Sequence, residues 1–309
     1  MSRSMQHGPG TGACAVATHG LSKRYGGETA LDRVDLRVPD GAVYVLVGAN
    51  GAGKSTTLRV LMNLVRPDSG TAEVLGMDTG RRGAEVRAQV GYVPDGRDHA
   101  PPRMTCGRLL RHAATFYPAW DAAYAGDLSR AFDLQPDRKV GALSKGEARR
   151  LHLVLALAHR PPVLLLDEPT DGLDPVVRRT ALALLAEHIA DTPTTVLIST
   201  HQIHEVESLA DHVGVLRAGR LAAQMSRDEL RRTVRRYQVE VPEGWKPPPE
   251  LRMAGLRRSS AGREVQGTLV GVEREVRERL TLAGGRVREA KPLSLEDAAV
   301  AFLTEEITG

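Results

Sequence analysis

The sequence lacks any long hydrophobic run. Within 309 residues, the longest apolar segments lie at 43–47 and 153–158. Both are far shorter than the ~18 residues that a membrane-spanning helix needs. The first residues also lack the hydrophobic core of a secretion signal. We therefore expect no membrane-spanning segment, so that work at a membrane would require a separate membrane chain.

Cysteine and net charge are also scarce. Cys14 and Cys106 are the two cysteines of the chain and form no C-x-x-C pair, which favours a reduced cytoplasmic protein over a disulfide scaffold or a thiolate metal site. The 42 basic residues nearly balance the 38 acidic ones, for a net charge of +4. No dense basic stripe stands out, and we expect no nucleic acid among the partners.

Apolar residues are abundant enough for a large core. They make up 41% of the chain, and the length predicts one large domain and one small domain. Residues 1–18, rich in Gly, Ser and Ala, are predicted to form a disordered tail. We place the large domain at 19–225, with a helical insertion at about 97–147, and a small C-terminal α+β domain at 226–309.

The large domain has the pattern of an α/β fold. Uniformly apolar strands are predicted at 43–47, 163–166 and 195–198, and helices at 55–64, 147–158 and 175–189. Such alternation is typical of a mainly parallel sheet that helices cover on both faces. Residues 31–38 instead alternate between apolar and polar, which predicts a half-buried strand. The small domain is predicted to contain strands at 237–241, 264–270 and 286–289, and helices at 272–283 and 294–303.

A phosphate-binding loop follows the first of these apolar strands. Residues 48–56 read GANGAGKST and match G-x-x-x-x-G-K-[ST]. Glycines let backbone N–H groups surround an oxyanion, and the next helix directs its positive end at the same phosphates. Lys54 is expected to reach the β- and γ-phosphates, and Ser55 to bind Mg²⁺. A chance glycine-rich turn is the alternative, and the strand and helix on either side disfavour it. The predicted nucleotide-binding residues here are Gly48, Asn50, Gly51, Ala52, Gly53, Lys54, Ser55 and Thr56.

Two carboxylates end the apolar strand at 163–166. Asp167 is predicted to hold Mg²⁺, and Glu168 to act as the general base that accepts a proton from the attacking water. A solvated strand end is the ordinary alternative for such a pair, and the phosphate loop upstream makes that alternative the weaker one.

Further motifs occur in the order found in one family. Residues 143–147 read LSKGE before a helix, 171–174 read DGLD, and His201 follows the strand at 195–198. Over about 21–225 the chain resembles the nucleotide-binding subunits of ATP-binding cassette (ABC) transporters. The resemblance implies a P-loop NTPase with a mainly parallel sheet, an antiparallel β subdomain and a helical insertion, and it implies ATP and Mg²⁺ as ligands.

The resemblance also implies roles for single residues. His201 corresponds to the switch histidine near the γ-phosphate, and with Lys54 and Glu168 it forms the expected catalytic set. Tyr25 corresponds to the aromatic residue that stacks on adenine. Ser144, Gly146 and Asp174 correspond to residues at the nucleotide interface, where the signature segment of one subunit closes on ATP held by another. Taken alone, a tyrosine or a histidine is more often an ordinary structural residue.

Three positions depart from the family pattern. Lys145 stands where the family has glycine, and Glu147 where it has glutamine. Asp95, in the segment YVPD, stands where the family has a glutamine that touches the metal and is influenced by the membrane partner. A carboxylate is a good Mg²⁺ ligand, so Asp95 joins Ser55 and Asp167 as a predicted metal-binding residue.

The resulting hypothesis is an ATP-hydrolysing subunit of an ABC transporter. It would form a homodimer, or pair with a related ATPase subunit, and attach to the cytoplasmic face of the membrane through a separate polytopic permease. Residues 292–303 resemble the closing helix of ABC-2-type exporter ATPases, which favours export. A soluble ABC-family ATPase acting on ribosomes or DNA is the alternative. A P-loop kinase is a third hypothesis, against which the signature segment and His201 argue.

Overall fold

The centre of the fold is a six-stranded sheet with the strand order β11-β10-β4-β9-β8-β7. The computed structural model describes residues 13–96, 101–247, 251, 253–259 and 263–304. Neighbouring strands are parallel except for β11, which pairs antiparallel with β10. The strands are β4 (Val43–Val47), β7 (Val90–Val93), β8 (Val163–Asp167), β9 (Thr195–Thr200), β10 (His212–Arg217) and β11 (Arg220–Ser226).

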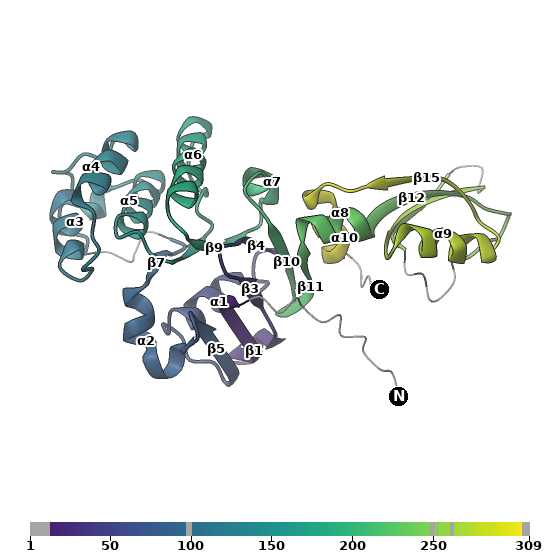
Figure 1. The fold of residues 1–309 in the computed structure, drawn as a ribbon, viewed down its shortest axis with the longest axis horizontal. Coiled ribbons are helices and arrows are strands. Elements are labelled where there is room, and N and C mark those ends of the chain that lie inside the picture. The colour runs from purple at the N-terminus through teal and green to yellow at the C-terminus, as the bar shows by residue number, and fades with distance from the viewer. Residues whose placement is uncertain (1–12, 97–100, 248–250, 252, 260–262, 305–309) are drawn as a thin grey trace.

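Every residue of β4, β8 and β9 is buried, because both faces of this sheet are covered. This confirms the predicted α/β class and explains why these strands are uniformly apolar. Helices α5 (Lys145–Leu157) and α6 (Pro175–Asp191) cover one face (Figure 1), and their predicted ends differ from the observed ones by a few residues. Helices α3 (Cys106–Ala114) and α4 (Ala122–Ala131) pack against α5 in the predicted helical insertion.

The other face meets α1 (Lys54–Leu61) and an antiparallel sheet. This sheet has the order β2-β1-β5-β6, with β3 also paired to β1. Helix α2 (Thr79–Ala88) connects it to β7, and sequence reasoning did not anticipate that helix. The strands are β1 (Cys14–Tyr25), β2 (Glu28–Val34), β3 (Arg37–Pro39), β5 (Ser69–Val74) and β6 (Met77–Asp78).

Two predictions about this region were wrong. The expected disordered tail at 1–18 includes strand residues, since β1 begins at Cys14; residues 1–12 lie outside the described part of the chain. Small residues at 14–18 pair with β3 and β5, and long-range pairing outweighs their weak local signal. The single strand expected at 31–38 is two strands, because β2 ends at Val34 and β3 begins at Arg37.

The C-terminal part forms a four-stranded antiparallel sheet with the order β13-β14-β12-β15. The predicted strands and helices occur there, and β13 and α8 are additional. Helix α9 packs on this sheet and α10 on β10 and α7, so we keep the domain boundary near residue 225 as a proposal. The elements are α7 (Ile203–Val206), α8 (Arg227–Thr233), β12 (Val234–Glu240), β13 (Ala254–Arg258), β14 (Glu264–Val270), α9 (Glu273–Leu282), β15 (Arg286–Pro292) and α10 (Leu295–Thr304).

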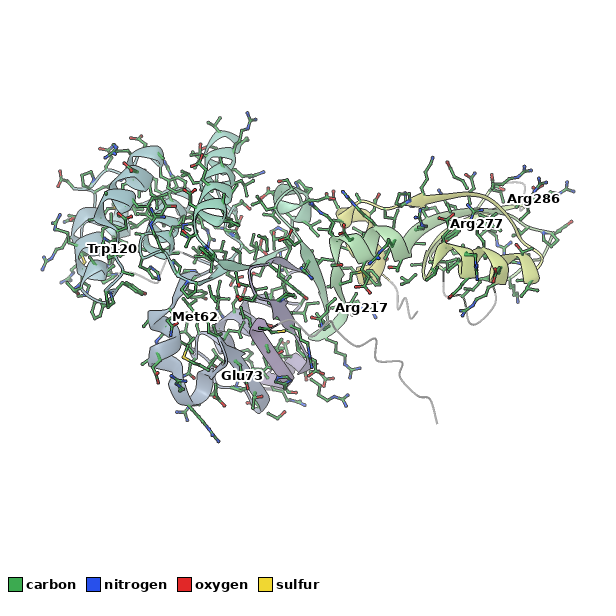
Figure 2. All side chains as sticks on the ribbon, viewed as in Figure 1. Met62, Glu73, Trp120, Arg217, Arg277 and Arg286 are labelled. Carbon is green, nitrogen blue, oxygen red and sulfur yellow. The ribbon has the colours of Figure 1, made fainter. Side chains whose placement is uncertain are left out.

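The molecule is elongated in this view. Figure 2 shows Trp120 at the end formed by α3 and α4, and Arg277 and Arg286 at the opposite end, in the C-terminal sheet unit. The phosphate-loop strand β4 lies between these ends (Figure 1).

Candidate functional site

The phosphate loop joins β4 to α1 in a shape that requires glycine at two points. A Cβ atom on Gly48 would lie 2.4 Å from the carbonyl oxygen of Leu216, and one on Gly53 would lie 2.4 Å from that of Ala30. Gly53 also has a φ of 107° and directly precedes α1 at Lys54. Only glycine adopts such a conformation without strain. The loop is thus held open at the helix N-terminus, where an oxyanion binds favourably.

Lys54 is buried at this loop, with 5% of its surface exposed. Its Nζ donates to the carbonyl oxygens of Gly48 (2.8 Å) and Ala49 (3.3 Å). The same Nζ lies 3.4 Å from Oε1 of Glu168. The ammonium group is therefore already desolvated and positioned above the loop, where it can exchange these partners for phosphate oxygens.

Asp167, at the end of β8, is fully buried. The hydroxyl of Ser199 donates to Oδ1, whereas Oδ2 has no hydrogen-bond partner among the described residues. Burial raises the pKa of this carboxyl, and the hydroxyls of Ser199 and Ser55 oppose that rise. A buried carboxylate oxygen without a partner is costly unless a cation meets it. Asp167 and Ser55 therefore have the chemistry of a divalent-cation site.

Glu168 is held in an unusual backbone conformation. Its φ is 48°, in the left-handed region, and its amide donates to the carbonyl oxygen of Ser199 at 2.9 Å. Oε1 lies 3.0 Å from Nδ1 of His201, and Oε2 accepts from the His201 amide at 3.3 Å. Non-glycine residues in this region are often functional. The two contacts fix the carboxylate beside Lys54 and beside the end of β9.

A cavity of about 480 Å³ unites most of the predicted residues; we call it the phosphate-loop cavity. Five predicted site residues do not line it: Gly48, Ser144, Gly146, Asp167 and Asp174. Gly48 and Asp167 lie behind the lining in the loop base and strand end. The lining consists of Tyr25, Ala30, Asn50, Gly51, Ala52, Gly53, Lys54, Ser55, Thr56, Asp95, Lys145, Glu168, Asp171 and His201.

Tyr25 lies at the outer rim of this cavity. It is 46% exposed, and the Nζ of Lys23 lies 5.6 Å from the centre of its ring. An exposed ring beside a cavity of this size can stack on a planar base with little dependence on hydrogen-bonding pattern.

The signature segment at 143–147 begins α5. The Ser144 hydroxyl accepts from the Glu147 amide at 3.2 Å, and the Glu147 carboxylate accepts from the Ser144 amide at 2.8 Å. This reciprocal arrangement is a capping box, and it lowers the pKa of Glu147. Gly146 has a packing role within the chain, since a Cβ there would lie 2.7 Å from the Gly172 carbonyl oxygen.

Lys145 and the DGLD segment are in direct contact. The Nζ of Lys145 lies 2.5 Å from Oδ2 of Asp171, and its aliphatic chain covers Gly172, whose φ is 79°. Asp174 caps α6 and accepts from the amides of Val176 and Val177, both at 3.0 Å. The LSKGE and DGLD segments therefore form one continuous surface.

Arg149, which sequence reasoning missed, is the largest fully buried side chain of the described structure. It lies on α5, and its guanidinium contacts Asp95 at 3.4 Å (Nη2 to Oδ1) and the carbonyl oxygens of Pro94 and Asp167. No local pattern marks it, since arginine is usually exposed. The predicted metal-binding residue Asp95 is thus already paired with a cation, although its side chain is 43% exposed and lines the cavity.

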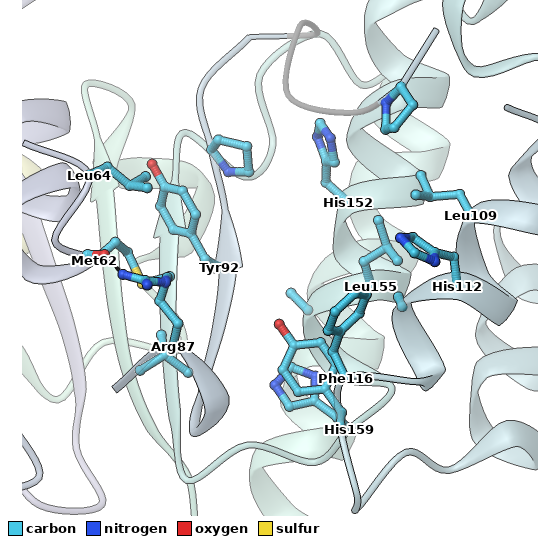
Figure 3. A pocket seen from close by; sticks show the side chains of 16 residues that line it. Met62, Leu64, Arg87, Tyr92, Leu109, His112, Phe116, His152, Leu155 and His159 are labelled. Atoms are coloured by element: carbon cyan, nitrogen blue, oxygen red, sulfur yellow. Dashed lines mark hydrogen bonds between the residues drawn. The ribbon is translucent and has the colours of Figure 1, made fainter. Parts of the chain in front are cut away.

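A second cavity, of about 460 Å³, opens between α5 and α3 on one side and β7 and α2 on the other. In Figure 3, Tyr92, Met62, Leu64 and Arg87 lie on one side, and Phe116, His112 and His152 lie on the other. We call it the helical groove. Most of its lining is apolar or aromatic, and no carboxylate is among the described lining residues.

Comparison with known proteins identifies the family. The family model described as "ABC transporter" matches residues 31–171. The daunorubicin resistance ATP-binding protein DrrA3 of Streptomyces coeruleorubidus is 35% identical over 93% of this chain and 92% of its own length. The chain belongs to the ABC transporter ATP-binding proteins. The Nod factor export ATP-binding protein I of Ralstonia nicotianae, another member, is 35% identical over 72% of this chain and 71% of its own length.

A solved structure agrees with the fold of the cassette. It is described as the ATP-binding subunit of an ABC transporter, is 29% identical, and superposes with a TM-score of 0.64 over 71% of this chain and 92% of its own. This confirms the P-loop NTPase fold and the prediction of an ATP-binding ATPase of this family. It favours the transporter hypothesis over a soluble ATPase that acts on ribosomes or DNA. No helix in the described ranges is long and apolar enough to cross a membrane.

Proposed function

We propose that this cassette hydrolyses ATP to drive export through a separate membrane permease, with Glu168 as the general base. The contact set of Glu168 is the observation that carries the proposal. Its carboxylate lies between the Lys54 ammonium and the His201 ring, at the edge of the phosphate-loop cavity. That is where a water molecule in line with a γ-phosphate would need a proton acceptor.

The chemistry follows from these positions. ATP enters with its base on Tyr25 and its phosphates on the loop amides, and the γ-phosphate replaces Glu168 as a partner of Lys54. The released carboxylate accepts a proton from the attacking water while the water oxygen bonds to the γ-phosphorus. The bond to the bridging oxygen breaks, leaving ADP and phosphate. The backbone amide of His201 keeps the Glu168 carboxylate in place, and the ring N–H, released from Glu168, donates to a γ-phosphate oxygen.

Mg²⁺ fits the residues at the base of the cavity. The partnerless Oδ2 of buried Asp167 and the hydroxyl of Ser55 would hold it, and Asp95 would reach it from the rim. The ion would neutralise charge that accumulates on the β- and γ-phosphate oxygens.

A second subunit would complete the site. Ser144 is exposed and does not line the cavity of its own chain, and Gly146 does not line it either. Their helix N-terminus remains suited to phosphate and would meet the nucleotide of a partner cassette. We propose a homodimer, with a related ATPase subunit as the other arrangement. Each nucleotide would then be bound by the loop of one subunit and the signature segment of its partner.

The helical groove supplies a docking surface for the membrane partner. Apolar side chains from two units of the fold line it, and its arginine and histidine lining residues are Arg87, His112, His152 and His159. A cytoplasmic segment of the permease that carries apolar residues and a carboxylate would complement it. Attached in this way, the cassette would lie on the cytoplasmic face of the membrane.

Export is favoured over import by two observations. The relatives from Streptomyces coeruleorubidus and Ralstonia nicotianae are named for drug resistance and for export. The first of them matches 93% of this chain, a span that must include much of the C-terminal sheet unit. The closing helix α10 also coincides with the segment that resembles exporter ATPases.

The decisive experiment replaces the base and keeps its shape. We expect Glu168→Gln to lower kcat at least about a hundredfold, because the amide cannot accept the proton. ATP binding should persist, and light scattering should show a dimer in excess Mg-ATP. Glu187→Gln, on the exposed face of α6, is the matched control and should behave as the wild type. Full turnover by a monomeric Glu168→Gln protein would overturn the proposal.

A further inference from the structure

Arg149 joins three motifs through one side chain. Its Nη1 donates to the carbonyl oxygens of Pro94 (2.5 Å) and Asp167 (3.0 Å), and its Nη2 lies 3.4 Å from Oδ1 of Asp95. Only 1% of the side chain is exposed. Arg149 itself belongs to α5, which begins at the signature segment. The guanidinium therefore joins the signature helix, the segment after β7 and the carboxylate end of β8.

The two residues that Arg149 holds after β7 face different cavities. Pro94 lines the helical groove, and Asp95 lines the phosphate-loop cavity. Tyr92, two residues earlier, also lines the groove, and its pKa is raised to about 12, chiefly by burial and also by the charge of Asp167. One peptide bond joins Pro94 and Asp95. A displacement of Pro94 in the helical groove therefore acts directly on a residue that lines the phosphate-loop cavity.

A buried guanidinium resists such displacement strongly. Removing a buried cation from its partners leaves an uncompensated charge, which is far more costly than the pairing is favourable. Its planar arrangement of donors also fixes the angle between acceptors, a property that the single ammonium of lysine does not share. The carbonyl oxygens of Pro94 and Asp167 are thereby held at a constant separation through one rigid group.

We propose that Arg149 is a positioning residue that mechanically links the helical groove to the metal-binding end of β8. When the segment that contains Pro94 and Asp95 moves, Arg149 moves Asp167 with it. The cation ligand Asp167 and the adjoining base Glu168 then reach their working geometry together. Use of this link by a membrane partner rests on the proposed function, whereas the link itself does not. Arg149 touches no substrate and acts through Pro94, Asp95 and Asp167.

The test is hydrogen–deuterium exchange on the full-length Arg149→Lys protein, with Arg150→Lys as the matched control. Arg150 is the next residue of α5 and donates to the carbonyl oxygen of Phe132 at 2.7 Å, away from both cavities. ATP with EDTA is the probe, so that no metal is needed. In the wild type and the control, ATP should slow exchange in peptides covering 48–56 and 91–96. In Arg149→Lys, it should slow exchange at 48–56 only.

Steady-state kinetics provide the second readout. With Mg-ATP, we expect Arg149→Lys to lower kcat about tenfold and to change KM less than about threefold, since the phosphate loop is intact. Protection of 91–96 equal to the wild type, or an unchanged kcat, would overturn the proposal. Loss of protection at both peptides would also overturn it, because Arg149 would then only support the fold.

A milder variant keeps the test informative if Arg149→Lys does not fold. Asp95→Asn changes a side chain that is 43% exposed and weakens one of the three contacts. Protection of 91–96 by ATP with EDTA should fall to an intermediate level, and full protection would count against the link. Because the exchange experiments with ATP and EDTA need neither hydrolysis nor a permease, their failure would leave the Glu168→Gln result untouched.

Discussion

At the residue scale, the two departures within the signature have physical explanations. Glu147 replaces glutamine and closes a capping box with Ser144, a role that either residue type fulfils. Lys145 replaces glycine and pairs with Asp171 in the same chain, so its charge is partly satisfied without nucleotide. The pair is largely exposed and contributes little to stability. Neither departure removes a group that would contact phosphate.

Asp95 leads to a prediction at the same scale. We expect Asp95→Ala to lower ATPase activity at least about tenfold, because Arg149 loses a partner and the cavity loses a carboxylate. Asp95→Gln, which introduces the amide usual in the family, should retain more activity than Asp95→Ala. Turnover at saturating Mg-ATP is the measurement. Equal, wild-type turnover in both variants would show that Asp95 lies outside the metal shell.

At the element scale, the contact between α4 and α6 contains a buried histidine. His188 is 1% exposed, and its ring stacks on Tyr124 with a centroid distance of 5.9 Å. Its Nδ1 lies 3.1 Å from the Tyr124 hydroxyl, and Nε2 has no hydrogen-bond partner in the described structure. Burial lowers the pKa of His188 to about 4. The neutral ring is therefore the form that the fold accommodates.

This predicts a loss of stability at mildly acidic pH. The unfolded chain binds a proton at His188 below about pH 6.5, whereas the folded chain resists it until about pH 4, so stability falls as pH falls through that window. At pH 5 the expected cost is about 1–2 kcal/mol. Urea unfolding at pH 7.5 and pH 5 should show a smaller pH effect in His188→Gln than in the exposed control His204→Gln. Equal pH effects would contradict the assignment.

At the scale of the whole molecule, α10 attaches the C-terminal unit to the ATPase core. Leu295, Ala298, Ala299 and Phe302 belong to the same buried cluster as Val213 of β10 and other residues of the central sheet. The C-terminal sheet unit has a separate apolar cluster that includes Tyr237 and Leu280. The chain thus leaves the ATPase core after β11, forms this unit, and returns to the core at α10.

We expect Phe302→Ala to lower the free energy of unfolding by about 3–5 kcal/mol, because a large ring is removed from a packed core. Phe302 is 4% exposed, whereas Val300 on the same helix is 51% exposed. Val300→Ala is therefore the matched control, with an expected effect below about 0.5 kcal/mol. Thermal and urea unfolding measure both. Similar melting curves for the two variants would show that α10 is not docked on the core.

The sequence by itself determined the ligand class and the main elements. The phosphate loop, the strand ending in Asp167 and Glu168, and the strand before His201 are contiguous patterns, and each depends on local backbone geometry. The parallel sheet followed from uniformly apolar strands between helices. These features are predictable because residues close in sequence produce them.

The tertiary structure alone decided which residues support that chemistry. Strand β1 begins at Cys14 because distant strands pair with it. Arg149 is buried because two segments far from it in sequence, at 94–95 and at Asp167, surround its guanidinium. The contact of Gly146 with Gly172 likewise depends on a neighbour that no local pattern reveals. The sequence records what each segment prefers, whereas packing determines which segments meet and which charges are thereby buried.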